Sequence, residues 1–167
     1  MRTSTLLCVM ILSAVAVAPL RATQQRPLPA FEVVAPSGAA VSSQQLSTER
    51  RWLLLYVAPG CKSCDQLLGS LKEWHTSQLA SRTVVVVRAS RDQAAEYISS
   101  HMPAEASDLR WYADPGSAAW QALALTGTPV LVGIDAGEVK WMVSGVLNDP
   151  RALEPVVRSW VEYQEMP

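Results

Sequence analysis

Two cysteines separated by two residues are the side chains in this sequence best suited to chemistry. Cys61 and Cys64 lie in the segment 58–64, whose letters are APGCKSC. A thiol pair at this spacing can close a disulfide, and a thiolate can pass that disulfide to another protein by direct attack on sulfur. The third cysteine, Cys8, lies in an apolar run near the start of the chain, and we expect it to be removed with that run. The remaining pair is spaced too closely to join distant parts of a fold, so it predicts redox chemistry.

The pattern around the pair places it where a strand ends and a helix begins. The apolar run 52–58 has the length and composition of a strand buried on both faces. Residues 62–80 then read as a helix, and Cys64 shares the phase of its apolar positions, so it should face the core. The positions in phase with it are Leu67, Leu68, Leu71 and Trp74.

The start of this helix favours the thiolate of Cys61, because backbone N–H groups and the helix dipole stabilise an anion there. Cys61 is therefore the predicted nucleophile. Cys64, one turn deeper, is the predicted resolving thiol, which attacks the mixed disulfide and releases the partner. The neighbours Gly60 and Lys62 are expected to modulate this reactivity. The contribution of Lys62 should be small, because an exposed ammonium is screened by solvent and salt.

Three other uses of the cysteine pair compete with exchange. A zinc site needs four ligands, and His75 and His101 fit no partner spacing and read as surface residues. A purely structural disulfide gains little from closing so short a loop. A peroxidatic cysteine would be preceded by Pro and Thr at fixed offsets, whereas Pro59 and Gly60 directly precede Cys61. We therefore expect neither a metal nor any other cofactor.

Composition and charge narrow the class of protein. The 167 residues are 49% apolar and 17% charged, with a formal charge of -1, which is typical of one folded domain without a nucleic-acid surface. Residues 1–22 read as a secretory signal, with Arg2 before the apolar run Leu6 to Ala18. That run of thirteen residues is about 20 Å long as a helix, too short for a hydrocarbon core of about 30 Å. We expect cleavage near Ala22 and no stable membrane span afterwards.

The remaining pattern alternates strands with helices. After the signal, residues 23–30 form a Pro-rich linker, and residues 31–167 form the predicted domain. The six tryptophans are expected to pack in the core, with Trp141 the first candidate for an exception. Strands are predicted at 31–34, 83–88, 109–112, 130–134 and 138–143, and further helices at 92–101, 117–125 and 150–163.

The ordered set of motifs resembles the thioredoxin superfamily, in particular its exported TlpA-like redoxin branch. The set comprises the apolar strand before Cys-X-X-Cys, the segment TGTPV at 126–130, the turn DAGE at 135–138 and Gly145. The resemblance implies an α/β thioredoxin-like fold, a central mixed β-sheet flanked by helices with a strand-helix insertion in the middle. It also implies a cis bond between Thr128 and Pro129, which would face the two thiols and bind substrate.

This chain departs from the family pattern at several positions. Plain thioredoxins carry Trp-Cys-Gly-Pro-Cys, whereas Gly60 precedes the first thiol here and Lys62-Ser63 separate the two. The buried acid that thioredoxins keep six residues before the first cysteine is Leu55 here, and the glutamate that some TlpA-like proteins place three residues after the second is Leu67. Asp65 is close by but should point elsewhere. Residues 57–68 also resemble the accessory proteins of methylamine dehydrogenase maturation.

The expectation is an exported, periplasmic oxidoreductase that exchanges disulfides with protein clients and with a separate redox partner. Catalysis is assigned to Cys61 and Cys64, and substrate binding to Thr128 and Pro129. The alternative from another class is a non-catalytic thioredoxin-like binding module or a copper-handling chaperone. Copper handling would favour additional Met, Cys or His ligands near Cys61, and the sequence shows none close by.

Overall fold

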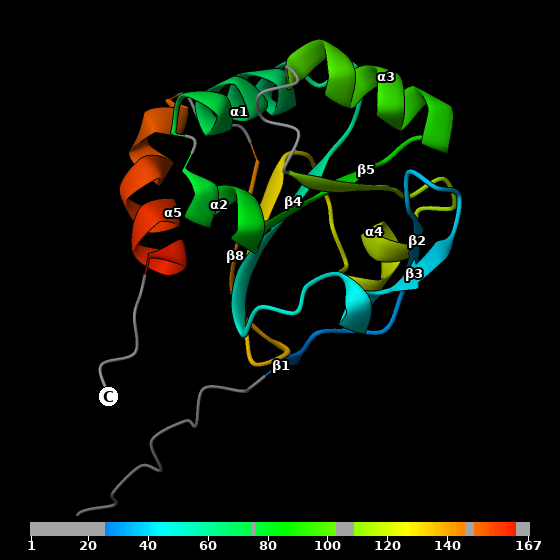
Figure 1. The fold of residues 1–167 in the computed structure, drawn as a ribbon, viewed down its shortest axis with the longest axis horizontal. Coiled ribbons are helices and arrows are strands. Elements are labelled where there is room, and N and C mark those ends of the chain that lie inside the picture. Colours follow the sequence, from blue (N-terminus) through cyan, green and yellow to red (C-terminus); the bar gives the residue numbers. More distant parts are fainter. Residues whose placement is uncertain (1–25, 75, 103–108, 146–148, 163–167) are drawn as a thin grey trace, which may run out of the picture.

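The structure is a computed structural model, and it describes residues 26–74, 76–102, 109–145 and 149–162. The predicted signal, residues 1–22, and His75 lie outside the described residues. Figure 1 shows the described chain as a twisted sheet with helices packed around it.

Eight strands form one mixed sheet in the order β1-β8-β7-β4-β5-β6-β2-β3. The strand before the cysteine pair, β4, lies at its centre, parallel to β5 on one side and antiparallel to β7 on the other. The bounds are β1 Arg26–Pro27, β2 Glu32–Val34, β3 Ala40–Ser42, β4 Arg51–Val57, β5 Thr83–Val87, β6 Arg110–Ala113, β7 Val130–Asp135 and β8 Glu138–Ser144.

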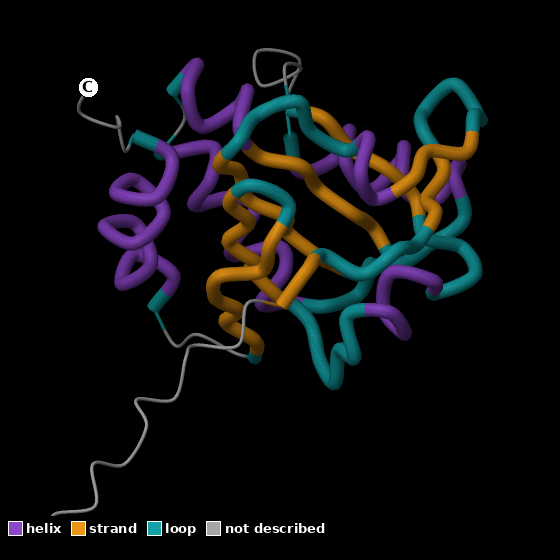
Figure 2. Tube along the Cα trace, turned by 90° about the horizontal axis from the view of Figure 1, so that it is seen from below, coloured by secondary structure: helices purple, strands orange, loops and turns teal. Residues whose placement is uncertain are grey.

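The central strands are apolar along most of their length, and both faces of the sheet are covered. Figure 2 shows helices on both sides of the strands. Alternate residues of β4 enter two separate cores, since successive side chains of a strand point to opposite faces. Leu55 and Val57 belong to the core that also contains Cys64, whereas Leu54 and Tyr56 belong to the other. The continuous apolar run therefore predicted a central strand correctly.

The helices divide between these two cores. The core with Cys64 takes buried side chains from α1, α2, α3 and α5, and the other core takes Ala119 from α4. The bounds are α1 Lys62–Glu73, α2 Ser77–Arg82, α3 Arg91–His101, α4 Ala118–Ala122 and α5 Glu154–Val161, with two short 3-10 helices, η1 Ser43–Gln45 and η3 Pro150–Leu153.

The prediction of one helix over 62–80 was wrong, because the chain forms two. The first helix, α1, ends at Glu73, and a new helix begins after Thr76, whose side chain accepts a hydrogen bond from the backbone N–H of Leu79. A threonine N-cap satisfies a backbone donor that a continuous helix would have to bond internally. The second helix turns back to pack beside α5 and leads into β5. Apolar periodicity alone did not reveal this break.

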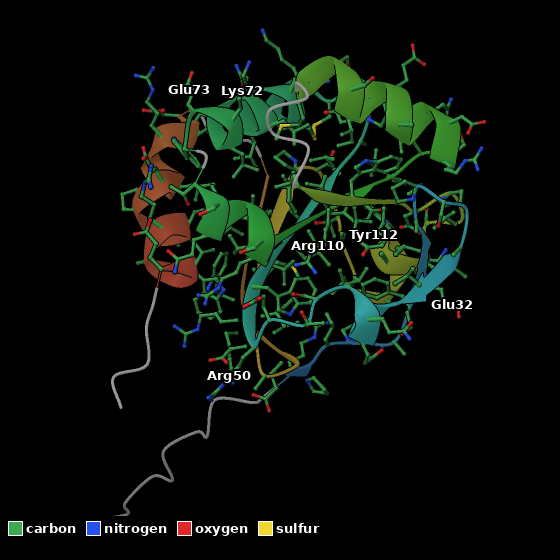
Figure 3. All side chains as sticks on the ribbon, viewed as in Figure 1. Glu32, Arg50, Lys72, Glu73, Arg110 and Tyr112 are labelled. Carbon is green, nitrogen blue, oxygen red and sulfur yellow. A yellow bond between two sulfur atoms is a disulfide. The ribbon has the colours of Figure 1, made fainter. Side chains whose placement is uncertain are left out.

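The predicted insertion is present as α3 and β6, between β5 and α4. Arg110 of β6, labelled in Figure 3, anchors the insertion by donating hydrogen bonds to the carbonyl oxygens of Leu46 and Ser81. Part of the segment predicted as a linker is also packed on the sheet. Its strand β1 pairs with β8, and Leu28 is buried.

Candidate functional site

The two cysteines form a disulfide at the first turn of α1. Their Cα atoms are 5.2 Å apart. Cys61 is the N-cap of the helix, and its sulfur accepts a hydrogen bond from the backbone N–H of Cys64 at 3.2 Å. Capping donors and the helix dipole both favour negative charge at that sulfur.

The two sulfur-bearing residues differ sharply in burial. Cys64 has no exposed surface and packs among the apolar side chains of α1, as its helical phase predicted. Cys61 is half-buried and packs against the edge of the same core. Cys61 is therefore the more solvent-accessible of the two cysteines. Lys72 and Glu73, at the far end of α1, are exposed on the surface (Figure 3).

The residues flanking Cys61 form the turn that brings the chain from β4 into α1. Gly60 has a φ of +76°, a left-handed conformation that side chains rarely adopt, and this explains why glycine occupies the position. An added Cβ at Gly60 would meet no atom within 4 Å, so the requirement is conformational and not steric. Pro59, Gly60 and Lys62 are exposed.

Sheet register brings the predicted substrate-binding residues to the same edge as the disulfide. Tyr56, one residue before the end of β4, pairs with Val130 at the start of antiparallel β7. Thr128 and Pro129 directly precede Val130, so they lie at the edge from which the loop to Cys61 leaves. The bond between them is cis, as the family resemblance implied. Thr128 is half-buried and Pro129 is buried.

A cleft of about 510 Å³ lies beside this loop, a volume in the usual range for binding pockets. One side is formed by Pro59 and by residues just after β5, and the other by α3. The lining residues are Pro59, Arg88, Ala89, Gln93, Glu96, Tyr97 and Ser100.

The α3 wall of the cleft contacts α1, the helix that carries Cys64, through side chains of both helices. The hydroxyl of Tyr97 donates a hydrogen bond of 2.7 Å to Asp65, the residue after Cys64, and His101 Nε2 lies 3.3 Å from the same carboxylate oxygen. Burial raises the pKa of Tyr97, and the hydrogen bond to Asp65 raises it further. Asp65 thus points toward α3, and His101 is half-buried in a contact between helices. The sequence indicated neither contact, because the partners are 32 and 36 residues apart.

A buried carboxylate, Asp114, lies at the same edge of the sheet. Asp114 follows β6 and is 1% exposed. It accepts a 2.7 Å hydrogen bond from the Tyr56 hydroxyl and further hydrogen bonds from the backbone N–H groups of Ala118 and Trp120. Burial raises the pKa of Tyr56, and its hydrogen bond to Asp114 adds to the effect. Asp114 therefore holds the start of α4 against the end of β4. Sequence patterns did not identify this acid, and the position six residues before Cys61, where thioredoxins keep an acid, is the fully buried Leu55.

Two of the six tryptophans, Trp52 and Trp74, are buried in the cores, and the other four, Trp141 among them, are partly buried and pack against the cores. The ring of Trp141 lies against Gly133, where an added Cβ would come within 2.2 Å of it. The ring also meets Trp160 edge-on, with centroids 5.3 Å apart.

Within the described ranges, no group of three or more His, Cys, Asp or Glu side chains is placed to hold a metal ion. The same part of the chain has no helix that is both long and apolar enough to cross a membrane.

The sequence matches no family model, and no curated protein resembles it significantly. Solved structures with the same fold do exist. A secreted disulfide oxidoreductase from Mycobacterium tuberculosis, homologous to E. coli DsbE, superposes with a TM-score of 0.63 at 18% identity, covering 77% of this chain and 95% of that one. A putative thiol:disulfide interchange protein DsbE from Chlorobium tepidum gives a TM-score of 0.62 at 20% identity, covering 82% and 96%.

A third solved structure extends the likeness. The thiol:disulfide interchange protein of the thioredoxin family from Chlorobium tepidum TLS superposes with a TM-score of 0.61 at 16% identity, covering 84% of this chain and 99% of that one. At such identities the likeness is one of fold. Together with the mixed sheet, the helices on both faces and the inserted α3 and β6, it establishes that this chain has an α/β thioredoxin-like fold.

Proposed function

We propose that this chain is an exported thiol-disulfide oxidoreductase that acts on protein clients through Cys61 and Cys64. One observation carries the proposal. The disulfide caps the first turn of α1 with one half-buried and one fully buried cysteine. This asymmetry fits the two successive steps of exchange, in which one thiol must meet a client and the other must not. The names of the structural neighbours, which include thiol:disulfide interchange proteins, support the same reaction class.

The reaction follows from the positions of the two sulfurs. In the reduced protein, the Cys61 thiolate attacks one sulfur of a client disulfide, forms a mixed disulfide and releases the other client sulfur as a thiolate. The Cys64 thiolate then attacks the Cys61 sulfur, which releases the second client thiolate and closes the Cys61–Cys64 disulfide. Two electrons pass to the client, whose thiolates take up protons from water. A protein dithiol must return two electrons before the next cycle, and the reverse sequence would oxidise a client.

Substrate binding is assigned to Thr128 and Pro129. Both residues precede β7 at the edge where Cys61 lies. Pro129 has no N–H to compete for partners, and the backbone beside it can hold an extended client segment by short strand-like pairing. Such pairing uses backbone atoms, so it suits clients of varied sequence.

Export is part of the proposal and rests on the first 22 residues of the sequence. The Mycobacterium tuberculosis neighbour is described as secreted, which agrees with it. N-terminal sequencing of the protein recovered from its producing cell should find a start near Thr23. Recovery of intact Met1 in a membrane fraction would contradict cleavage.

The roles of the two cysteines are tested by alkylation of the reduced protein. Brief treatment with iodoacetamide, followed by peptide mass spectrometry, should label Cys61 well before Cys64, because Cys64 is fully buried. Cys64→Ala should accumulate mixed disulfides with clients, since the releasing thiol is absent. Faster labelling of Cys64, or no trapped client with Cys64→Ala, would reverse the assignment.

A further inference from the structure

Arg88 is the cationic side chain that lines the cleft beside the cysteine loop. It follows β5, and its backbone N–H donates a 2.8 Å hydrogen bond to the carbonyl oxygen of Val57, the last residue of β4. Because β4 and β5 are parallel, their carboxyl ends meet at one edge of the sheet. The side chain of Arg88 therefore shares the cleft with Pro59, two residues before Cys61.

The guanidinium of Arg88 is held in place although the residue is exposed. Its Nε donates a 3.1 Å hydrogen bond to the hydroxyl of Ser117, and its Cζ lies 4.4 Å from the centroid of the Trp120 ring. Both contacts come from the start of α4. A side chain fixed in this way loses less conformational entropy when it binds a ligand.

The guanidinium of Arg88 has no carboxylate partner within ion-pair distance among the described residues. Each ion pair that these residues form involves a cation other than Arg88. Asp114 accepts hydrogen bonds from Tyr56, Ala118 and Trp120. Glu96 lies on the α3 wall of the cleft and makes no ion pair with Arg88. Nε and the aromatic face are occupied, and the remaining guanidinium N–H groups can meet a planar anion.

We propose that Arg88 selects client segments that carry a carboxylate close to their reactive cysteine. The client carboxylate would bind the guanidinium inside the cleft, while the client sulfur reaches Cys61 beyond Pro59. Glu96 on the opposite wall is exposed and makes no ion pair with Arg88, so it does not occupy the guanidinium in place of the client carboxylate. This inference deepens the proposed exchange function and rests on it for the reaction, although the binding step can be measured separately.

The test uses two disulfide-bonded peptides that differ only in a Glu or Gln two residues from the reactive cysteine. With the reduced wild-type protein at low salt, kcat/KM should be about five- to tenfold higher for the Glu peptide, the size expected of one charge-assisted contact at a partly exposed site. The preference should appear in KM and should shrink at high salt. Equal kcat/KM values for the two peptides would overturn the proposal.

Variants at Arg88 separate the contribution of its charge from that of its planar geometry. The quantity compared is the ratio of kcat/KM for the Glu peptide to kcat/KM for the Gln peptide. Arg88→Gln should bring the Glu-to-Gln ratio to about one, because the charge is lost. Arg88→Lys should keep part of the preference, since an ammonium lacks the planar fork of a guanidinium. Because each ratio is taken within one variant, a general loss of activity or stability cancels. An unchanged ratio in Arg88→Gln would overturn the proposal.

Arg91→Gln is the matched control. It removes the same charge three residues away, but Arg91 is paired with Asp92 and is not among the residues that line the cleft. The Glu preference should persist in this variant. Its loss would show that the preference reflects overall charge and would overturn the role of Arg88.

Two further measurements distinguish failure of this inference from failure of the exchange function. Reduction of hydroxyethyl disulfide, which is small and uncharged, reports whether the cysteine pair exchanges at all. Serine versions of the two peptides, titrated into the oxidised protein, report binding without chemistry. The Arg88 Nε–H resonance should shift with the Glu peptide and not with the Gln peptide. An inert disulfide assay would contradict the exchange function, whereas equal shifts with both peptides would contradict the carboxylate site.

Discussion

Two arginines lie over tryptophan rings at opposite edges of the sheet, and their surroundings differ. At the amino end of β4, Arg51 Cζ lies 4.6 Å from the centroid of Trp160, and its guanidinium donates a 3.0 Å hydrogen bond to Asp135. At the carboxyl end of β5, Arg88 lies over Trp120 and forms no ion pair with any carboxylate that the structure describes. The arginine-tryptophan pair therefore has an acidic partner, Asp135, at the edge that we call the completed edge. It has none among the described carboxylates at the edge of Arg88, which we call the open edge.

The ion pairs at the completed edge stabilise the fold. Asp135 ends β7 and meets both Arg51 and Arg50, the latter at 3.3 Å; Arg50 is labelled in Figure 3. Burial alone would raise the pKa of Asp135, but the hydrogen bond and charge of Arg51, with Arg50 and Lys140, hold it below its usual range. The open edge carries the disulfide, the cleft and the left-handed Gly60. The ion pairs of Arg50 and Arg51 with Asp135 hold strands together. Arg88 forms no ion pair with a described carboxylate, so its guanidinium is available to a partner.

The largest expected effect on activity comes from the open edge. Cys61→Ser should reduce disulfide exchange to the uncatalysed rate, because the attacking thiolate is lost. Stability should fall by no more than about 2 kcal/mol, since the disulfide closes a very short loop. Exchange kinetics and urea unfolding measure the two effects. Ser63→Ala, between the cysteines, should keep exchange, and residual exchange in Cys61→Ser would show that Cys64 can act alone.

Asp135→Asn should have the largest effect on stability at the completed edge. It removes the acid shared by two arginines, and we expect a loss of about 2 kcal/mol at pH 7 with exchange unchanged. Because folding lowers the pKa of Asp135, its stabilisation is present above the unfolded pKa near 4 and is lost as pH falls through the folded value. Urea unfolding of wild type and variant should therefore converge in acid.

The control for this edge is Asp92→Asn, which removes an acid whose side chain is 84% exposed and should change stability very little. A difference between wild type and Asp135→Asn that stays constant from neutral pH to pH 2 would contradict the assigned charge interaction. Slowed exchange in Asp135→Asn would show that the two edges are coupled.

Gly60→Ala should be less costly and should act on the cysteine loop. With φ at +76° and no atom within 4 Å of the added Cβ, the cost is backbone strain of about 1 kcal/mol. Urea unfolding of the oxidised protein measures it. Gly69→Ala is the matched control, because Gly69 lies within α1 and also has open space. That change should stabilise the helix by up to about 1 kcal/mol, and equal effects of the two substitutions would refute a special conformation at Gly60.

Tyr97→Phe should give the smallest change. It removes the hydrogen bond to Asp65 that joins α3 to α1, and we expect a loss of up to about 1 kcal/mol, given the partly exposed acceptor. Folding raises the pKa of Tyr97, so its stabilisation is complete below the unfolded pKa near 10 and is lost as pH rises above it. Wild type should lose stability in alkali faster than Tyr97→Phe.

Tyr112→Phe provides the comparison for this measurement, because the half-buried Tyr112 has no hydrogen bond from its hydroxyl to the rest of the described chain. Urea unfolding at neutral pH should therefore place Tyr112→Phe closer to wild type than Tyr97→Phe. A larger loss of stability from Tyr112→Phe would show that the contact of Tyr97 with Asp65 does not contribute to stability.

The sequence by itself determined the local features of the site. The apolar run before the cysteines predicted β4, the phase of the leucines predicted that Cys64 is buried, and the motif order predicted the fold. These features depend on neighbours within a few residues, where strand and helix periodicity apply directly. The break between α1 and α2 was missed because a threonine cap competes with periodicity and leaves no apolar signal.

Only the tertiary structure decided which distant side chains meet. Asp65 reaches Tyr97 across 32 positions, and Arg51 reaches Asp135 across 84. Such pairs depend on sheet register and on the direction in which each helix leaves the sheet, which local patterns do not contain. One signal for Arg88 was present in the sequence: it directly follows a buried strand. Parallel strands end at a common edge, but that β5 lies parallel to and beside β4 became known only once the sheet was assembled.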